Sequence, residues 1–282
     1  MSKKENNNTL VKNATFLMVA ALISKIIGML YKSPLTTLIG RESFACFQFA
    51  QNAYFILLMI ASFSIPQAVS KIMSERIAFK RYRDAQRVFK GALLYAVIAG
   101  GIAALVCIFG ASILVPDNMA NARLALQMLA PTIFVSGILG VFRGYFQAYR
   151  NMLPTSISQI LEQIAVATVA LLASGFMVHH FANAGEDTLQ RWSAAGATMG
   201  TGAGVCTAFL FMLFVYRVNH KTIAKKIKND RVSVNESYRS IMKIILLIAA
   251  PIILSAFIYN VNGYINGVMY TSILGWKGVP NS

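Results

Sequence analysis

Seven long apolar runs, separated by shorter polar segments, dominate the pattern of this chain. They cover roughly residues 14–39, 44–72, 87–115, 121–147, 154–181, 190–218 and 240–270. Each run exceeds the ~20 residues that a helix needs to cross the hydrocarbon core of a bilayer. None of them alternates apolar and polar positions as the ~10-residue strands of an outer-membrane barrel do. The pattern therefore predicts an all-α integral membrane protein with seven transmembrane helices.

The runs and the polar segments between them divide the chain into four parts. We expect a cytoplasmic polar tail at 1–13, a six-helix N-terminal lobe at 14–218, a basic cytoplasmic linker at 219–239, and a seventh transmembrane helix with a truncated end at 240–282. The seventh helix would be the first helix of a second lobe. In the sixth run, Gly196, Gly200 and Gly204 recur at intervals of four, which predicts a face for close helix packing.

Composition and charge agree with a membrane protein. Of the 282 residues, 56% are hydrophobic and 13% are charged, which is more apolar than an ordinary soluble domain. A formal net charge of +16 would suggest nucleic-acid binding in a soluble protein. Here, however, the basic residues gather before the first run and in segments 71–90, 143–150 and 217–243, while the other side of the membrane has only Arg41, Arg123, Arg191 and Lys277.

This asymmetry is a topology signal, because cytoplasmic loops carry an excess of Lys and Arg. We therefore predict a multi-pass protein of the cell (plasma) membrane with a cytoplasmic N-terminus. Membrane lipids, including anionic lipids near the basic loops, are the expected partners of this surface. No nucleic-acid partner is predicted.

Two lysines inside the first run are the most informative polar residues. Lys25 lies about eleven residues into the run, near mid-bilayer at ~1.5 Å per residue. Lys32 follows seven residues later, so two helical turns bring both side chains onto nearly the same face. An ionisable residue inside the membrane indicates a functional site, since exposure to lipid costs a few kcal/mol or more. The pair predicts a protein-lined cavity that receives an anion. Snorkelling to the interface is the alternative, and it suits Lys32 better than Lys25.

Other polar residues within the runs would complete the lining of such a cavity. The predicted substrate-binding residues, besides the two lysines, are Gln48, Asn52, Glu162 and Asn262. Each amide could instead form an interhelical hydrogen bond, worth under ~2 kcal/mol. Glu162 has two further interpretations: it neutralises a cation such as Lys25, Arg143 or Arg150, or it takes up a proton or a coupling ion.

Motifs of enzymes and metal sites are missing from the sequence. It has no Ser, His and Asp set, no phosphate-binding Gly-rich loop with Lys, and no H-E-x-x-H helix. The three cysteines, Cys46, Cys107 and Cys206, fall singly inside apolar runs without the spacing of metal ligands. We therefore expect a protein that is not an enzyme and has no catalytic residues, no metal and no cofactor.

Three local sequences resemble one family of membrane proteins. They are S-K-I-I-G-M-L-Y-K-S-P-L-T-T-L-I-G from Ser24, S-I-P-Q-A-V-S-K-I-M-S-E-R from Ser64, and R-G-Y-F-Q-A-Y-R-N-M-L-P-T-S-I-S-Q-I-L-E-Q from Arg143. They are similar to segments of the MurJ-like and stage V sporulation protein B-like flippases, which are polysaccharide biosynthesis proteins. That group belongs to the multidrug, oligosaccharidyl-lipid and polysaccharide exporter superfamily.

The resemblance implies two six-helix lobes around a cavity that opens alternately to each side of the membrane. It also implies a substrate: an anionic polyprenyl-pyrophosphate-linked saccharide, such as a lipid II-type precursor of peptidoglycan. Lys25 and Lys32 match positions where this family places cations, often arginines. Lysine keeps the charge for a pyrophosphate but lacks the bidentate fork of arginine.

The resemblance covers one lobe plus the seventh helix. Alternating access by rocking one lobe against the other needs both lobes, so we expect this chain to be inactive alone and to need a C-terminal lobe. A drug or organic-cation antiporter of the same superfamily is the runner-up, which predicts acidic cavity residues, and only Glu162 fits it. A non-transporting, truncated membrane remnant is the third hypothesis.

Overall fold

The computed structural model describes residues 3–59, 62, 64–234 and 236–276, and within these ranges the chain forms helices and turns without a strand. The elements in chain order are α1 (Lys3–Leu30), α2 (Lys32–Ile39), α3 (Arg41–Leu58), α4 (Ile65–Ala78), α5 (Tyr82–Phe109), α6 (Ala111–Leu114), the 3-10 turn η2 (Asp117–Met119), α7 (Ala122–Ala148), α8 (Leu153–His180), α9 (Glu186–Lys228) and α10 (Tyr238–Trp276).

Six stretches of the described residues are long and apolar enough to cross a membrane. They are Thr15–Ile39, Tyr82–Phe109, Ala122–Ala148, Leu153–His180, Glu186–Lys221 and Tyr238–Ser255. The predicted span at 44–72 differs, because it is divided between α3 and α4. The all-α membrane fold is therefore confirmed, and the predicted count of seven spans is approximate.

Prolines explain where two of the predicted spans are interrupted. Proline has no backbone N–H, and its ring clashes with the carbonyl four residues earlier. Pro34 lies at the third position of α2, just after the turn at Tyr31 that separates α1 from α2. Pro66 lies in the first turn of α4, where the missing N–H costs no helical hydrogen bond. By contrast, α7 and α10 continue through Pro131 and Pro251.

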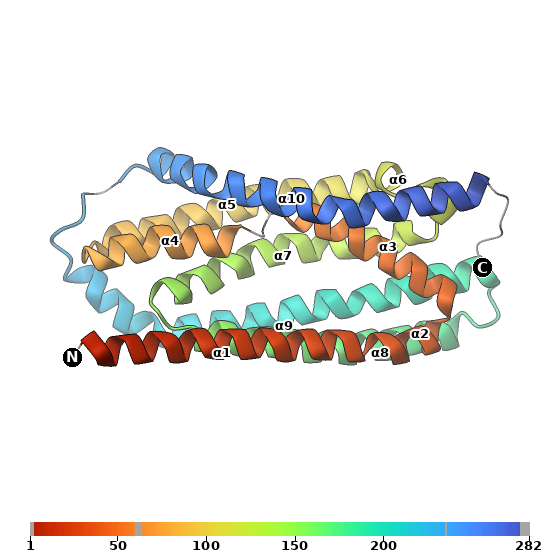
Figure 1. Cartoon of the computed structure of the whole chain (residues 1–282), viewed down its shortest axis with the longest axis horizontal. Coiled ribbons are helices and arrows are strands. Elements are labelled where there is room, and N and C mark those ends of the chain that lie inside the picture. The colour runs from red at the N-terminus through yellow and green to blue at the C-terminus, as the bar shows by residue number, and fades with distance from the viewer. Residues whose placement is uncertain (1–2, 60–61, 63, 235, 277–282) are drawn as a thin grey trace.

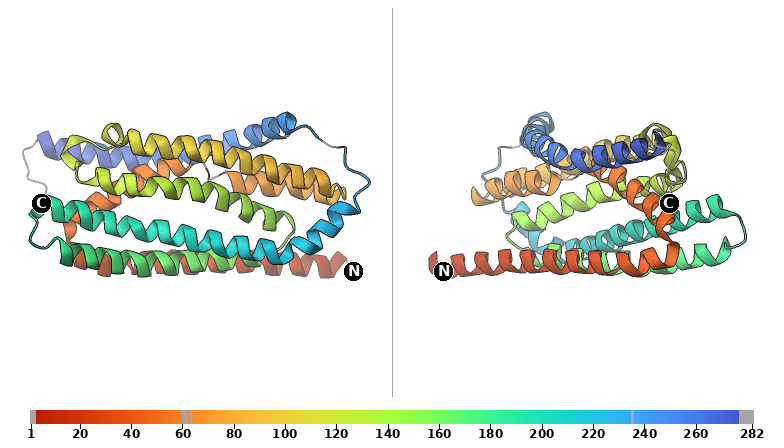
Figure 2. Two further views of the ribbon diagram at one scale, coloured as in Figure 1. Left: turned by 180° about the vertical axis from the view of Figure 1, so that it is seen from behind. Right: turned by 45° about the vertical axis from the view of Figure 1, so that its right-hand side comes forward.

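The helices run roughly parallel to the long axis of the molecule. Their packing links α8 to α9, α7 to both α9 and α5, and α1 to α8. On the face seen in Figure 1, α1 and α10 lie along opposite edges and α3 crosses between them, while Figure 2 shows α8, α9, α7 and α5 on the opposite face. α10 packs on α5, α3 and α4, so the helix after the basic linker covers one edge of the preceding bundle.

The packing of α8 against α9 depends on the glycines of α9. A Cβ added to Gly200 would lie 2.6 Å from the Val166 carbonyl oxygen, and one added to Gly204 would lie 2.7 Å from the Glu162 carbonyl oxygen. Only glycine allows the two backbones to approach this closely. The predicted close-packing face is therefore confirmed, and it lies beside the backbone of Glu162.

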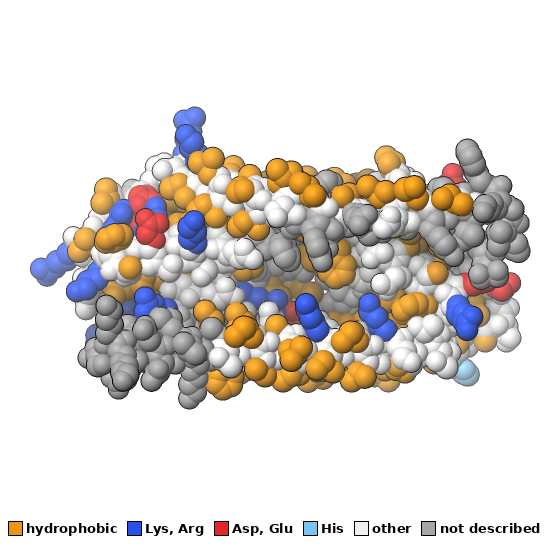
Figure 3. All heavy atoms as spheres, viewed as in Figure 1, with side chains coloured by type: hydrophobic (Ala, Val, Ile, Leu, Met, Phe, Trp, Pro, Cys, Tyr) orange, Lys and Arg blue, Asp and Glu red, His pale blue; other side chains and the backbone are white. Residues whose placement is uncertain are grey.

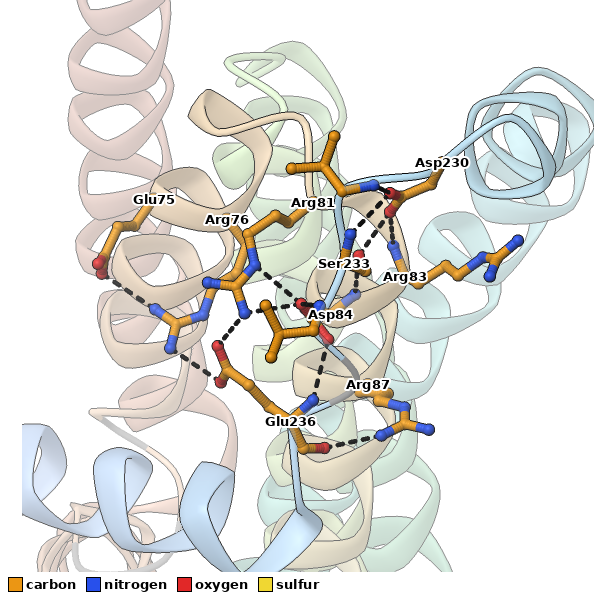
Figure 4. Close-up of polar contacts among 11 residues, drawn as sticks. Glu75, Arg76, Arg81, Arg83, Asp84, Arg87, Asp230, Ser233 and Glu236 are labelled. Carbon is orange, nitrogen blue, oxygen red and sulfur yellow. Dashed lines mark hydrogen bonds and ion pairs between the residues drawn. The ribbon is translucent and has the colours of Figure 1, made fainter.

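The segment predicted as a linker at 219–239 is partly helical. α9 continues to Lys228 and α10 begins at Tyr238, so residues 229–237 form the connection. This connection is attached to the corner between α4 and α5 by a network of ion pairs and hydrogen bonds, which we call the linker clasp (Figure 4). Its members are Arg76, Arg81, Arg83, Asp84, Arg87, Asp230, Ser233 and Glu236.

Two carboxylates organise the first part of the linker clasp. Asp84 is fully buried, and it accepts the backbone N–H groups of Val234 at 3.0 Å and Glu236 at 3.1 Å, as well as Arg81 Nε at 2.9 Å. The Glu236 carboxylate in turn accepts Arg76 Nη2 at 3.0 Å and Arg81 Nη2 at 2.7 Å. Buried charges are stable only when they are paired and hydrogen-bonded in this way.

Asp230 organises the second part of the clasp. It accepts the backbone N–H of Arg83 at 2.7 Å and of Val232 at 2.8 Å, and the Ser233 hydroxyl at 2.6 Å. Burial of Asp230 opposes ionisation, but the hydrogen bonds from Ser233, Arg83 and Val232 outweigh it and lower the pKa of this carboxyl below its ordinary value of 3.8. These hydrogen bonds thus favour the ionised form of Asp230.

Candidate functional site

A cavity of about 470 Å³ lies among the helices that precede the linker. Its lining comes from α1, α2, α3, α4, α7, α8 and α9, and no described residue of α10 is part of it. A volume of this size is typical of small-molecule sites, which range over ~300–1,000 Å³. Figure 3 shows the molecule hollowed between the edge formed by α1 and α2 and the edge formed by α10, with basic side chains along the α1 and α2 side.

Four of the predicted site residues line this cavity. Lys32 enters it from α2, Gln48 and Asn52 from α3, and Glu162 from α8. Lys32 is half-buried, and no carboxylate of the described residues forms an ion pair with its ammonium. It is therefore a cation that remains available to an anion in the cavity.

Of the other two predicted residues, one lies outside the cavity and one outside the described side chains. Lys25 is exposed and is absent from the cavity lining. The prediction of one lysine stripe assumed a single continuous helix, whereas α1 ends at Leu30 and α2 begins at Lys32. Asn262 belongs to α10, and its side chain lies outside the described part of the structure.

Arg143 is a cavity residue that sequence reasoning missed as a site residue. It lies on α7 and donates from Nη2 to Glu162 Oε2 at 2.6 Å and from Nε to Ser158 Oγ at 3.1 Å. The hypothesis that Glu162 neutralises a cation is thus confirmed, with Arg143 as the partner. The available signal was the third family-like segment, which contains both residues and connects their two helices.

Neighbouring packing fixes the backbone on both sides of this ion pair. On α7, Phe142 and Tyr145 flank Arg143 and contact Tyr216 of α9, with ring centroids 5.4 Å and 5.3 Å apart. Gly144 allows α4 to approach, because a Cβ there would lie 2.7 Å from the Pro66 carbonyl oxygen. On α8, the backbone of Glu162 lies against Gly204. The backbone beside both members of the pair is therefore closely packed.

Several polar atoms of the cavity lack a hydrogen-bond partner among the described residues. They are Gln48 Oε1, Ser62 Oγ, Thr155 Oγ1 and Gln159 Oε1, all of them buried in residues that line the cavity. Gln51, by contrast, donates from Nε2 to Thr201 Oγ1 at 2.7 Å and joins α3 to α9. Because buried polar groups are normally satisfied, these atoms indicate an occupant with hydrogen-bonding groups, either water or a polar ligand.

The family model for the polysaccharide biosynthesis proteins matches residues 10–279. This chain belongs to that family. The resemblance inferred from the three local segments is therefore confirmed, and with it the assignment to a multi-pass membrane protein. A family of this kind points to membrane transport rather than to catalysis.

Two curated relatives of this chain are from Bacillus subtilis (strain 168). The chain is 25% identical over 271 residues to the lipid II flippase MurJ, covering 92% of this chain and 49% of MurJ. It is 24% identical over 279 residues to the stage V sporulation protein B, covering 96% of this chain and 51% of that protein. The chain thus spans about half the length of the curated relatives it matches.

Solved structures support the fold of this family member. A MATE in complex with MaD5 superposes with a TM-score of 0.67 at 15% identity, covering 88% of this chain and 53% of the MATE chain. A MOP superfamily transporter from Pyrococcus furiosus superposes with a TM-score of 0.63 at 16% identity, covering 86% of this chain and 52% of the transporter chain. At this level of identity the likeness establishes the fold of the half that is matched.

Proposed function

We propose that this chain forms the N-terminal half of a flippase for an anionic polyprenyl-pyrophosphate-linked saccharide of the lipid II type. The observation that carries this proposal is Lys32, a cavity cation without an acidic partner among the described residues. A phosphate would supply the missing negative charge. The buried, unpartnered atoms of Gln48 and Gln159 would accept hydrogen bonds from saccharide hydroxyl or amide groups.

Orientation follows from the distribution of charge. The N-terminus, the corner between α4 and α5, and the connection from α9 to α10 lie at the same end of the molecule in Figure 1. This end carries Lys3, Lys4 and the basic residues of 71–90 and 217–243. The positive-inside rule supports a cytoplasmic location for this end, and therefore for the N-terminus.

A binding measurement with the whole chain in lipid nanodiscs tests the proposed ligand. The probe is an undecaprenyl-pyrophosphate-linked saccharide, and the variants are Lys32→Gln and, as a matched control, Lys90→Gln, whose side chain is exposed on α5. We expect K32Q to weaken binding by about tenfold or more, since a charge-assisted contact contributes ~1.5–3 kcal/mol, and K90Q to leave it unchanged. Equal binding by K32Q and K90Q contradicts the proposal.

The same nanodisc preparation also tests the alternative that the protein is a drug antiporter. An antiporter of organic cations would bind a cationic dye through Glu162, whereas here Glu162 is already paired with Arg143 at 2.6 Å. We expect no dye binding that depends on Glu162. Dye binding that is lost in Glu162→Gln and unaffected in K32Q would instead support the antiporter.

Turnover is proposed to need a second half, since this chain covers about half of each curated relative. Vesicles containing this chain should therefore show no movement of a labelled lipid-linked saccharide between leaflets above protein-free vesicles, with MurJ as the positive control. Movement that increases with the amount of chain and is lost in K32Q would overturn this part of the proposal.

A further inference from the structure

Two cationic side chains among the described residues line the cavity, and they differ in whether they have an ion-pair partner. Lys32 has no ion-pair partner among the described residues, whereas Arg143 is bound to Glu162 and Ser158. The Arg143 and Glu162 side chains are 16% and 19% exposed, so both still face the open volume of the cavity. An ion pair with this exposure can be exchanged for another without unfolding of the helices around it.

Charge makes such an exchange favourable for the ligand class proposed above. With Lys32, Arg143 and Glu162 all ionised, these lining side chains carry a net charge of one positive unit. A pyrophosphate diester carries more than one negative charge. If Glu162 leaves Arg143, both cations become available to the ligand, and the planar guanidinium can bind phosphate oxygens through two donors.

The geometry of Arg143 is suited to an exchange of partners. Its Nε is held by the Ser158 hydroxyl, which itself donates to the Thr155 carbonyl at 2.7 Å. Nη2 donates to Glu162 Oε2 at 2.6 Å. Ser158 can thus hold the plane of the guanidinium while Glu162 turns away. Packing against Gly204 keeps the α8 backbone in place during this change.

We propose that Glu162 is an internal competitor that occupies Arg143 in the empty cavity and is displaced from it by the anionic headgroup. The inference rests on the proposed function and adds two roles to it: Arg143 becomes a substrate-binding residue, and Glu162 limits its affinity. An internal carboxylate that takes back Arg143 lowers the cost of releasing the anion. Transport requires such release as much as it requires binding.

The test is a double-mutant cycle with the whole chain in nanodiscs and inorganic pyrophosphate as the probe. The proteins are the wild type, Glu162→Gln, Arg143→Gln and the double variant. We expect E162Q to bind pyrophosphate about tenfold more tightly, R143Q to bind it at least about tenfold more weakly, and the double variant to bind like R143Q. Glu75→Gln is the matched control, because Glu75 pairs with Arg76 at 3.0 Å outside the cavity.

A purely structural ion pair gives a different result. In that case E162Q would lower the thermal unfolding midpoint and bind pyrophosphate no more tightly than the wild type, which overturns the inference. If E162Q does not fold, Glu162→Asp replaces it: the shorter carboxylate should also tighten binding, and equal or weaker binding again overturns the inference.

The outcomes also separate this inference from the proposed function. If K32Q and R143Q both bind pyrophosphate as the wild type does, the anion-binding cavity itself is wrong. If both weaken binding while E162Q does not tighten it, only the competition by Glu162 is wrong.

Discussion

Lys32 and Lys25 lie in different surroundings, although both are lysines of the first apolar run. Lys32 lines the cavity, whereas Lys25 is exposed outside it. We therefore predict that Lys25→Gln weakens binding of a lipid-linked pyrophosphate by no more than about threefold, and K32Q by about tenfold or more, because only a contacting charge contributes the full interaction. Titration of labelled ligand into nanodiscs measures both. A larger loss in K25Q than in K32Q contradicts this order.

The sequence pattern predicted the position of some cavity residues but not of others. Gln48, Asn52 and Glu162 were placed correctly in the cavity, because polar residues in a membrane helix turn toward protein or water. Lys25 was not: its side chain on α1 is exposed, and only Lys32, on α2, lines the cavity. Arg143 was missed as a site residue because sequence spacing does not reveal that its side chain lies against Glu162 across two helices.

The contact between helices α8 and α9 is sensitive to side-chain size. Gly200→Ala would place a Cβ 2.6 Å from the Val166 carbonyl oxygen, so we expect it to lower the free energy of unfolding by ~1–3 kcal/mol. Gly101→Ala is the control, because nothing lies within 4 Å of a Cβ at that position on α5. Unfolding by denaturant in detergent measures the difference. Equal stabilities of the two variants would disprove the close contact.

The linker clasp consists of ion pairs and hydrogen bonds, which hydropathy does not predict. We expect Asp84→Asn to lower the free energy of unfolding by about 3 kcal/mol, because it removes the buried charge that pairs with Arg81 and accepts the backbone N–H groups of Val234 and Glu236. The freed connection should then be cut faster by trypsin after Arg231. Asp117→Asn is the control, since the Asp117 side chain is 99% exposed. Unchanged cleavage in D84N would show that the clasp does not hold this segment.

Asp230 makes the attachment of the connection dependent on pH. Its pKa is lower in the folded protein than its ordinary value of 3.8, so its contribution to stability is present above pH 3.8 and is lost as the pH falls below that value. The wild type should therefore be more stable than Asp230→Asn at pH 6, and the difference should shrink by pH 3. Thermal unfolding at both pH values checks this, and a difference independent of pH would contradict it.

For the whole molecule, hydropathy predicted the class of fold and glycine spacing predicted one packing face. Neither predicted the division into α3 and α4 or the extension of α9 to Lys228. The first difference has a local cause, the proline in the first turn of α4. The cavity formed by these helices is the basis of the proposed function, because it combines a lysine that has no acidic partner among the described residues with the ion pair of Arg143 and Glu162.

Photo-crosslinking tests this account most directly. A polyprenyl-pyrophosphate lipid with a photoreactive group next to the diphosphate is incorporated into nanodiscs with the whole chain, and labelled peptides are identified by mass spectrometry. We expect labels on peptides of α2, α7 and α8 that surround Lys32, Arg143 and Glu162, and their loss in K32Q. Labels confined to segments outside the cavity, or labelling unchanged in K32Q, would contradict it.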